Sequence, residues 1–334
     1  MTKNIKYCHV VAKMTDVMEK AVQESPRRSG MYNWMYVHKG EMRAVDEMQK
    51  EDFEKYDVVQ VNLSPVDQII VPRIRRMLGN NSNTKLILNN DYVCEAWDGW
   101  NIHPQQFLDV QKLGDGLFGT EPYQTSNLID GAFNMPHPTW TKSLKRYGRT
   151  APGSRIKIGV MFHHWEKKHF LSASNIYQLR DELRKPVEAK LYGYMGPEFD
   201  LNARWVKSMW TKIMPMTDFP SFISDMSKNT MMYEPCTYHT YGRASVDSAC
   251  IELPTVGSDR VGSMRRLWPN SCCDPTDGKK TRELMHKWLA DKKWASEQLE
   301  FAYSNVDYYN YDNCRERYLK MLEEVDERIP PYMR

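Results

Sequence analysis

The chain has 334 residues, of which 41% are hydrophobic and 27% are charged, and its formal net charge is +3. This length exceeds that of a usual single domain and predicts two domains, each large enough to bury its own core. A net charge this small does not indicate nucleic-acid binding by bulk electrostatics, and only local patches such as Arg73, Arg75, Arg76, Arg265 and Arg266 are candidate phosphate contacts.

The remaining composition predicts a cytoplasmic protein. Seven cysteines without C-x-x-C spacing indicate neither a zinc site nor a disulfide framework. We expect no membrane span, because no apolar stretch approaches the roughly 18 residues that a spanning helix needs. We expect no signal segment, because the N-terminal residues are predicted to run directly into a strand. The oligomeric state is left open.

The first half of the chain alternates predicted strands and helices. Apolar runs predict strands at 5–12, 31–38, 56–63, 85–89, 114–120 and 132–135. Helices are predicted at 16–24, 64–77 and 122–129. Ser64 is expected to cap the second of these helices, and Pro72 to kink or restart it. Its apolar face is expected to hold Val66, Ile69, Ile70, Ile74 and Met77.

The second half repeats this alternation after a basic, glycine- and proline-bearing stretch at 141–155, which we interpret as a linker. Strands are predicted at 156–162, 188–193 and 230–234, and helices at 173–183, 218–227, 277–303 and 311–328. Repeated strand–helix–strand units predict the α/β class, with a doubly wound parallel sheet in each domain. Ligands are expected beyond the carboxyl ends of the strands.

The segment from His239 to Asp259 reads as a turn, a short helix, a Leu-Pro break and a strand. Gly242 lets the backbone approach a ligand closely, and the start of the helix offers N–H groups and a positive dipole end to an anion. Asp247 lies about a turn and a half further on, where a carboxylate can accept hydrogen bonds from a ribose. The alternative is an ordinary helix between two strands, which can also begin with glycine and carry an aspartate.

This segment resembles the C-terminal donor-site segment of GT-B glycosyltransferases of the glycogen-synthase-like, group 1 type. Tyr241, Gly242, Leu253 and Pro254 match the family pattern as they stand. His239 and Asp247 occupy the positions of the two usual glutamates. The histidine departs from the family, in which the first acid helps to position the transferred sugar.

The resemblance implies two Rossmann-like domains facing each other across a cleft. Residues 1–145 would form the acceptor-side domain, residues 155–305 the nucleotide-sugar-binding domain, and residues 306–334 a helix that crosses back to the first domain. It also implies metal-independent transfer of a hexose from a nucleoside-diphosphate sugar, with UDP-sugar favoured, to an acceptor hydroxyl with retention of configuration. The nucleotide sugar is a co-substrate, and no cofactor is expected.

We expect the following residues to bind the donor: Lys167, Lys168, Tyr241, Gly242, Arg243 and Asp247. Either lysine, in the loop after the strand at 156–162, would neutralise the diphosphate, and the sequence does not choose between them. The alternatives are a solvated charge cluster for the lysines and a surface ion pair for Arg243. A metal site at the neighbouring histidines is not favoured, because no acidic or cysteine cluster completes it.

His239, Asp16 and Asp91 are the candidate catalytic residues, and His38 is a further candidate base. For the acids, the alternative is a capping or solvated carboxylate. The acceptor is expected to be a glycan or a hydroxylated base in viral DNA, since abundant aromatic residues suit both. A different function remains open, namely that of a catalytically inactive protein that binds nucleotide sugars, for which His239 is the main argument.

Overall fold

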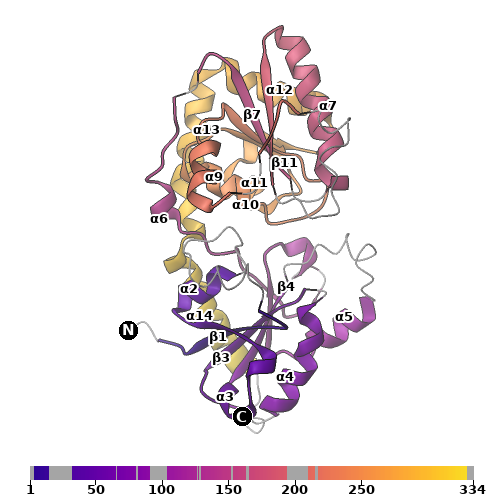
Figure 1. Cartoon of the computed structure of the whole chain (residues 1–334), viewed down its shortest axis with the longest axis vertical. Helices are drawn as coiled ribbons and strands as arrows, with labels where there is room; N and C mark the ends of the chain where they lie inside the picture. Colours follow the sequence, from indigo (N-terminus) through magenta and orange to yellow (C-terminus); the bar gives the residue numbers. More distant parts are fainter. Residues whose placement is uncertain are drawn as a thin grey trace. The chain divides into compact units, whose positions relative to one another are not determined.

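The computed structural model describes residues 4–14, 32–64, 66–79, 82–90, 104–125, 127, 129–151, 153–162, 165–193, 210–214 and 217–328. The chain divides into two compact units (Figure 1). Met1–Thr139 and Tyr309–Arg334 form the N-terminal unit, and Trp140–Tyr308 forms the C-terminal unit. Each unit contains a six-stranded sheet whose described strand pairings are all parallel.

The sheet of the N-terminal unit has the strand order β2-β1-β3-β4-β5-β6. Its strands are β1 (Tyr7–Val11), β2 (Glu41–Ala44), β3 (Val58–Asn62), β4 (Lys85–Asn90), β5 (Gly116–Gly119) and β6 (Phe133–Asn134). This is a doubly wound order that reverses direction between β1 and β3. The carboxyl ends of those two strands are therefore the expected ligand position of this unit.

Helices cover both faces of the N-terminal sheet. On one face, α2 (Asn33–His38) and α14 (Tyr311–Arg328) pack against an apolar cluster that includes Tyr7, Ile87 and Phe118. Figure 1 shows α14, in yellow, beside α2. The other face holds α3 (Lys50–Phe53), α4 (Val71–Leu78) and α5 (Pro104–Gln111), which bury Phe53, Ile74, Leu78, Phe107 and Val110.

The sheet of the C-terminal unit has the order β12-β11-β10-β7-β8-β9. Its strands are β7 (Ile156–Phe162), β8 (Val187–Gly193), β9 (Lys212–Met214), β10 (Met231–Glu234), β11 (Thr255–Ser258) and β12 (Cys272–Cys273). Numbered within the unit, this is the 3-2-1-4-5-6 order of the Rossmann fold, and its direction reverses between β7 and β10.

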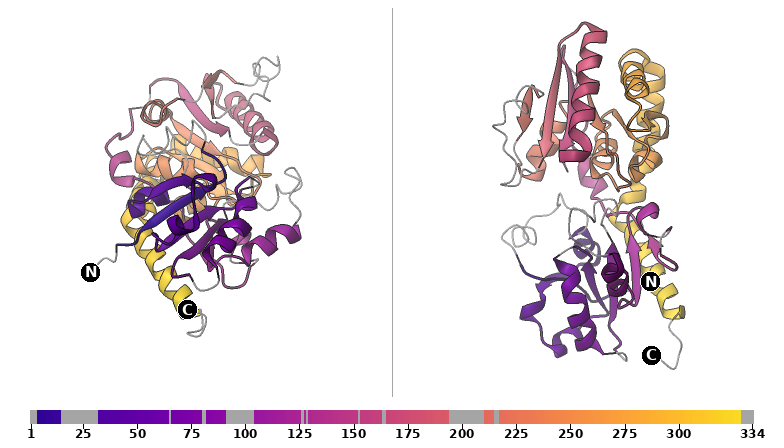
Figure 2. Two further views of the ribbon diagram at one scale, coloured as in Figure 1. Left: turned by 60° about the horizontal axis from the view of Figure 1, so that its bottom comes forward. Right: turned by 90° about the vertical axis from the view of Figure 1, so that its right-hand side faces the viewer.

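Among the described residues, the helices of this unit are α6 (Thr141–Leu144), α7 (Trp165–Leu183), α9 (Phe219–Met226), α10 (Arg243–Cys250), α11 (Gly262–Leu267), α12 (Gly278–Ala290) and α13 (Lys292–Asn305). The further views in Figure 2 show helices on both faces of each sheet. Helices α7 and α12 share one face, where the Asn175 amide donates to the Tyr233 hydroxyl at 2.8 Å. Helix α9 lies on the opposite face, where its Asp225 meets Lys190.

One predicted strand is wrong. The structure forms helix α2 within 31–38, and the second strand of the chain is β2. Asn33, Trp34, Met35, Val37 and His38 are all buried. A short segment that is buried on most sides has no period that separates strand from helix, so the sequence pattern could not decide.

The segment after β3 follows the prediction at its break and departs from it at its start. The Ser64 hydroxyl accepts the Asp67 N–H at 2.8 Å, but Val66, and not Ser64, directly precedes the 3-10 turn that follows. A 3-10 turn (Asp67–Ile70) precedes α4, and Pro72 stands in the first turn of α4, so the helix restarts there. The predicted apolar face is wrong at Val66 and Ile69, which are 62% and 63% exposed, because a 3-10 turn does not continue the period of a helix.

Several other boundaries agree with prediction. Strand β7 and helix α14 have exactly the predicted residues, and α9 lies within the predicted 218–227. The predicted helix at 122–129 is reduced to a 3-10 turn at Pro122–Gln124. The predicted helix at 16–24 falls outside the described residues. No helix of the described residues is long and apolar enough to cross a membrane.

Two histidines are buried on the α14 face of the N-terminal sheet. His9 lies on β1 beside the Tyr7 hydroxyl, and the His38 ring stacks on the Tyr7 ring with their centroids 5.0 Å apart. Burial lowers the pKa of each histidine to about 3, because a charged imidazole loses its hydration there. Both rings therefore stay neutral in the folded protein at neutral pH.

We expect the free energy of unfolding to fall as the pH is lowered from about 6.5 towards 3. In that window the unfolded chain protonates each histidine and the folded chain does not, which costs about 1.4 kcal/mol per pH unit for each. Urea unfolding between pH 5 and pH 6.5 measures this slope. His38→Gln should make the slope shallower by about that amount, and an unchanged slope in this variant would contradict the assignment.

Candidate functional site

Two helices of the C-terminal unit begin at the point where its strand order reverses. Helix α7 follows β7, and α10 follows β10, and these two strands are neighbours at the reversal. In open parallel sheets this position leaves a crevice beyond the strand ends that is not covered by a connecting helix. The segment singled out in the sequence thus lies at the expected ligand position of this unit.

The turn that precedes α10 is fastened to the start of α11. The Gly262 N–H donates to the Thr240 carbonyl at 2.8 Å, and the Ser263 N–H donates to the Tyr241 carbonyl at 3.1 Å. The Ser263 hydroxyl donates to the Gly242 carbonyl at 2.6 Å. Backbone bonds of this kind leave the turn little freedom, so α10 begins in a fixed position.

Gly242 is required at the helix start for two separate reasons. Its φ of 77° lies in the left-handed region that glycine adopts at little cost. A Cβ atom there would also overlap the Val261 side chain and approach the Ser263 hydroxyl to 2.8 Å. The glycine therefore provides both the turn geometry and the close approach of two segments.

Helix α10 brings Arg243 and Asp247 together. The Arg243 Nε donates to Asp247 Oδ1 at 2.7 Å, and the Asp247 side chain is only 2% exposed. The Arg243 guanidinium also lies over the Phe219 ring, 5.6 Å from its centroid. Asp247 is therefore buried and paired with a guanidinium one turn earlier on the same helix, so the ion pair considered for Arg243 is present and lies inside the fold.

The other predicted donor and catalytic residues are placed as follows. Tyr241 is buried, and His239 is half-buried in the turn after β10. Lys167 and Lys168 were expected in a loop that precedes a helix at 173–183. Helix α7 instead begins at Trp165, so both lysines lie in its first turn. Asp16 and Asp91 lie outside the described residues. His38 ends helix α2 and not a strand, as its role as a base had assumed.

The N-terminal unit contains a row of buried polar side chains that the sequence analysis did not single out. His9, Gln60, Asn62 and Asn89 lie on one face of the sheet near the carboxyl ends of β1, β3 and β4, and each is at most 3% exposed. The Asn89 amide donates to Asn62 Oδ1 at 2.9 Å, and the Tyr318 hydroxyl donates to Gln60 Oε1 at 3.1 Å. Amides that interrupt otherwise apolar strands were the available signal.

Asp67 ties two loops together at the carboxyl ends of β1 and β3. Its Oδ1 accepts the Ala12 N–H at 2.8 Å, and its Oδ2 accepts the Ser64 hydroxyl at 2.9 Å. The reversal point of the N-terminal sheet is therefore held by a buried carboxylate. Within the described residues, no group of three His, Cys, Asp or Glu side chains is placed to hold a metal ion.

No family model and no curated protein matches this sequence. Solved structures do match it. An α,α-trehalose-6-phosphate synthase from Burkholderia multivorans has a TM-score of 0.65 and 9% identity, over 90% of this chain and 78% of that chain. An α-glucosyltransferase in complex with UDP and a 13-mer DNA containing a central A:G mismatch has a TM-score of 0.62 and 10% identity, over 96% of this chain and 100% of that chain.

A mutant of S. aureus TarM in complex with fondaparinux, α-GlcNAc-glycerol and UDP has a TM-score of 0.60 and 11% identity, over 79% of this chain and 55% of that chain. The chain has the GT-B glycosyltransferase fold. It spans about half the length of TarM. These matches confirm the predicted α/β class with two Rossmann-like, doubly wound units.

We expect Gly242→Ala to destabilise the C-terminal unit more than Gly148→Ala does. Both glycines have a left-handed φ, of 77° and 59°, but nothing lies within 4 Å of a Cβ at Gly148. The two variants therefore share a backbone cost of about 1–2 kcal/mol, and only Gly242→Ala adds the overlap with Val261. Urea unfolding measures both losses; equal losses would show that the close approach contributes nothing.

Proposed function

We propose that the chain is a glycosyltransferase that moves a hexose from a nucleoside-diphosphate sugar, with UDP-sugar favoured, to an acceptor hydroxyl. The observation that carries this proposal is the position of α10, which begins at a left-handed glycine at the reversal point of a Rossmann sheet. Two of the comparison structures of this fold were solved with UDP, which supports a uridine nucleotide as the donor.

The proposed reaction breaks the bond between the anomeric carbon and the diphosphate oxygen and forms a bond from that carbon to the acceptor oxygen. The start of α10 would receive the diphosphate, and Lys167 or Lys168, in the first turn of α7, would add positive charge without a metal ion. Asp247, paired with Arg243, would contact the ribose. Tyr241 and His239 would border the transferred sugar.

The acceptor proton would pass to a carboxylate, for which Asp16 and Asp91 are the candidates. The resemblance to retaining enzymes leads us to propose that the anomeric configuration is kept. The acceptor is proposed to be a glycan or a hydroxylated base in DNA. The α-glucosyltransferase structure that contains a 13-mer DNA supports the second class.

A second candidate function is that of an inactive protein that binds nucleotide sugars. His239 stands where the family has an acid, and Asp247 is engaged by Arg243 in this structure. Both features weaken the contacts that the sugar and the ribose would otherwise receive. This protein would keep donor affinity and lack transfer.

Incubation with a panel of nucleotide sugars, followed by mass spectrometry, tests activity and donor choice together. We expect slow release of UDP from one UDP-sugar, with water as the acceptor. Release of a different nucleoside diphosphate would show that the donor carries a base other than uracil. Saturable binding without any free diphosphate would establish the inactive alternative, and the absence of both binding and release would refute the proposal.

We expect Asp247→Asn to raise the dissociation constant for UDP by about tenfold or more, because hydrogen bonds to a charged group contribute about 1.5–3 kcal/mol. Titration calorimetry measures this change. Asp291→Asn is the matched control, since Asp291 caps α13 in the same unit through the Trp294 N–H. Equal affinity in wild type and Asp247→Asn would remove Asp247 from the donor site.

If DNA is the acceptor, binding of duplex DNA should weaken steeply as salt is raised, because phosphate contacts release counterions. Fluorescence anisotropy with a labelled duplex between about 50 and 200 mM salt measures this dependence. An unlabelled neutral glycan serves as the competitor control. The absence of binding at the lowest salt concentration would leave the glycan as the proposed acceptor.

A further inference from the structure

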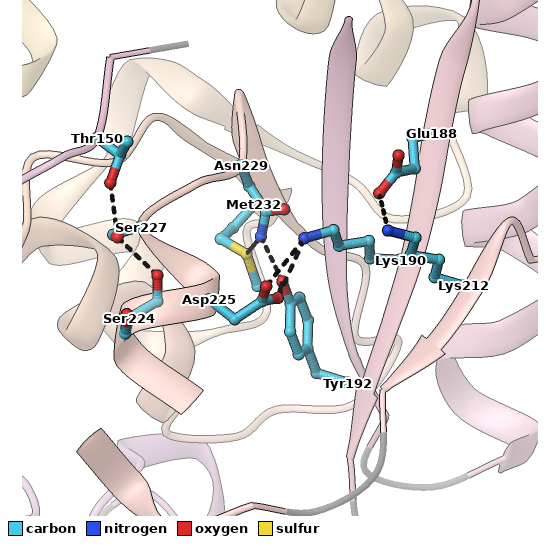
Figure 3. Close-up of polar contacts among 10 residues, drawn as sticks. All are labelled: Thr150, Glu188, Lys190, Tyr192, Lys212, Ser224, Asp225, Ser227, Asn229 and Met232. Carbon is cyan, nitrogen blue, oxygen red and sulfur yellow. Dashed lines mark hydrogen bonds and ion pairs between the residues drawn. The ribbon is translucent and has the colours of Figure 1, made fainter. Parts of the chain in front are cut away.

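Helix α9 is anchored near its C-terminal end by a buried polar network. Asp225 Oδ2 accepts the Tyr192 hydroxyl at 2.5 Å and the Lys190 ammonium at 3.1 Å, and the Asn229 amide donates to the Tyr192 oxygen at 3.0 Å. Figure 3 shows the Lys190 nitrogen and the Tyr192 hydroxyl meeting at the Asp225 carboxylate. The Lys190 side chain is only 5% exposed, so loss of its partner would leave a buried charge unpaired.

A glycine on the neighbouring strand leaves room for two side chains of this network. A Cβ atom at Gly159 on β7 would lie 2.6 Å from the Asn229 amide nitrogen and 2.9 Å from the Tyr192 ring. The glycine therefore leaves the space that the two side chains fill. Tyr192 and Asn229 are thus packed against β7 as well as hydrogen-bonded to each other, and Tyr192 in turn bonds to Asp225 of α9.

The other end of α9 lies beneath the candidate donor site. Asp218 accepts the Ser221 N–H at 2.9 Å and so caps the helix. The next residue, Phe219, is buried and presents its ring to the Arg243 guanidinium, 5.6 Å away. The Phe222 ring lies between the two ends of the helix, 6.3 Å from the Phe219 ring and 5.6 Å from the Tyr192 ring.

Groups from two elements contact Arg243. Its Nε donates to Asp247 on its own helix, and its guanidinium carbon lies over the ring of Phe219 on α9. A guanidinium on a flexible side chain has many orientations, and a ring face combined with a carboxylate selects one of them. The orientation of the Asp247 carboxylate follows from that of its partner.

We propose that Phe219 is a positioning residue of the donor site, which fixes the Arg243–Asp247 pair so that the carboxylate is presented to the ribose. This inference rests on the proposed function. The Lys190–Asp225–Tyr192 anchor fixes the helix that carries the ring. Phe219 itself does not need to touch the donor, so its loss should affect donor binding through Arg243.

The test compares Phe219→Leu with Phe53→Leu. Both variants remove a buried aromatic ring, and Phe53 lies in the core of the N-terminal unit, whereas α9 and Arg243 belong to the C-terminal unit. In Phe219→Leu we expect the Arg243 Nε–H resonance in nitrogen-15 spectra to shift and its hydrogen exchange to quicken, with an increase of about fivefold in the dissociation constant for UDP. Phe53→Leu should leave both close to wild type, and Phe219→Tyr should restore both.

The inference is overturned if the Arg243 resonance in Phe219→Leu is unchanged, or if the two leucine variants change it equally. It is also overturned if that resonance shifts while UDP affinity stays that of wild type. Failure of the proposed function has a different signature, because the wild-type protein would then bind no nucleoside diphosphate. The Arg243 resonance still decides in that case whether Phe219 positions the guanidinium.

Discussion

The reversal of strand order between β7 and β10 is the constraint on which the candidate site depends. The helix that follows β7 packs on the face of the sheet that carries Tyr233, whereas the helix that follows β10 packs with α9 on the opposite face. Two connections that leave for opposite faces cannot cover the strand ends between them. The turn at Gly242 lies at this uncovered edge and is held there by backbone bonds to α11.

Sequence reasoning succeeded where one local pattern decided the structure. Strand β7 is a mainly apolar run, interrupted by Lys157, and the order of turn, helix, Leu-Pro break and strand around α10 follows from residues with strong backbone preferences. The sequence-based predictions were wrong where tertiary contacts determined the local structure. Five of the six residues of α2 are buried. The exposure of Val66 and Ile69 results from a 3-10 turn in which the Asp67 carboxylate accepts the Ala12 N–H.

The candidate site was predictable as a position in the chain but not as a set of contacts. The sequence places Arg243 and Asp247 four residues apart on a helix, which permits an ion pair, yet nothing in it reveals the ring of Phe219 beneath the guanidinium. That contact depends on the packing of α9, which in turn depends on a lysine and an aspartate 35 residues apart. Long-range pairs of this kind leave no periodic signal in a single sequence.

The order of the two charged residues on α10, Arg243 before Asp247, is unfavourable for the helix dipole. Arg243 stands in the first turn, where the dipole repels a cation, and the acid of the pair lies towards the C-terminal end, which is the weaker orientation for such a pair. A helix selected for stability alone would carry the reverse order. Local rules are broken mainly at functional positions, where another requirement outweighs them. In the proposed donor site, a guanidinium beside the positive end of a helix would add to the attraction for a diphosphate, and this would account for the unfavourable order.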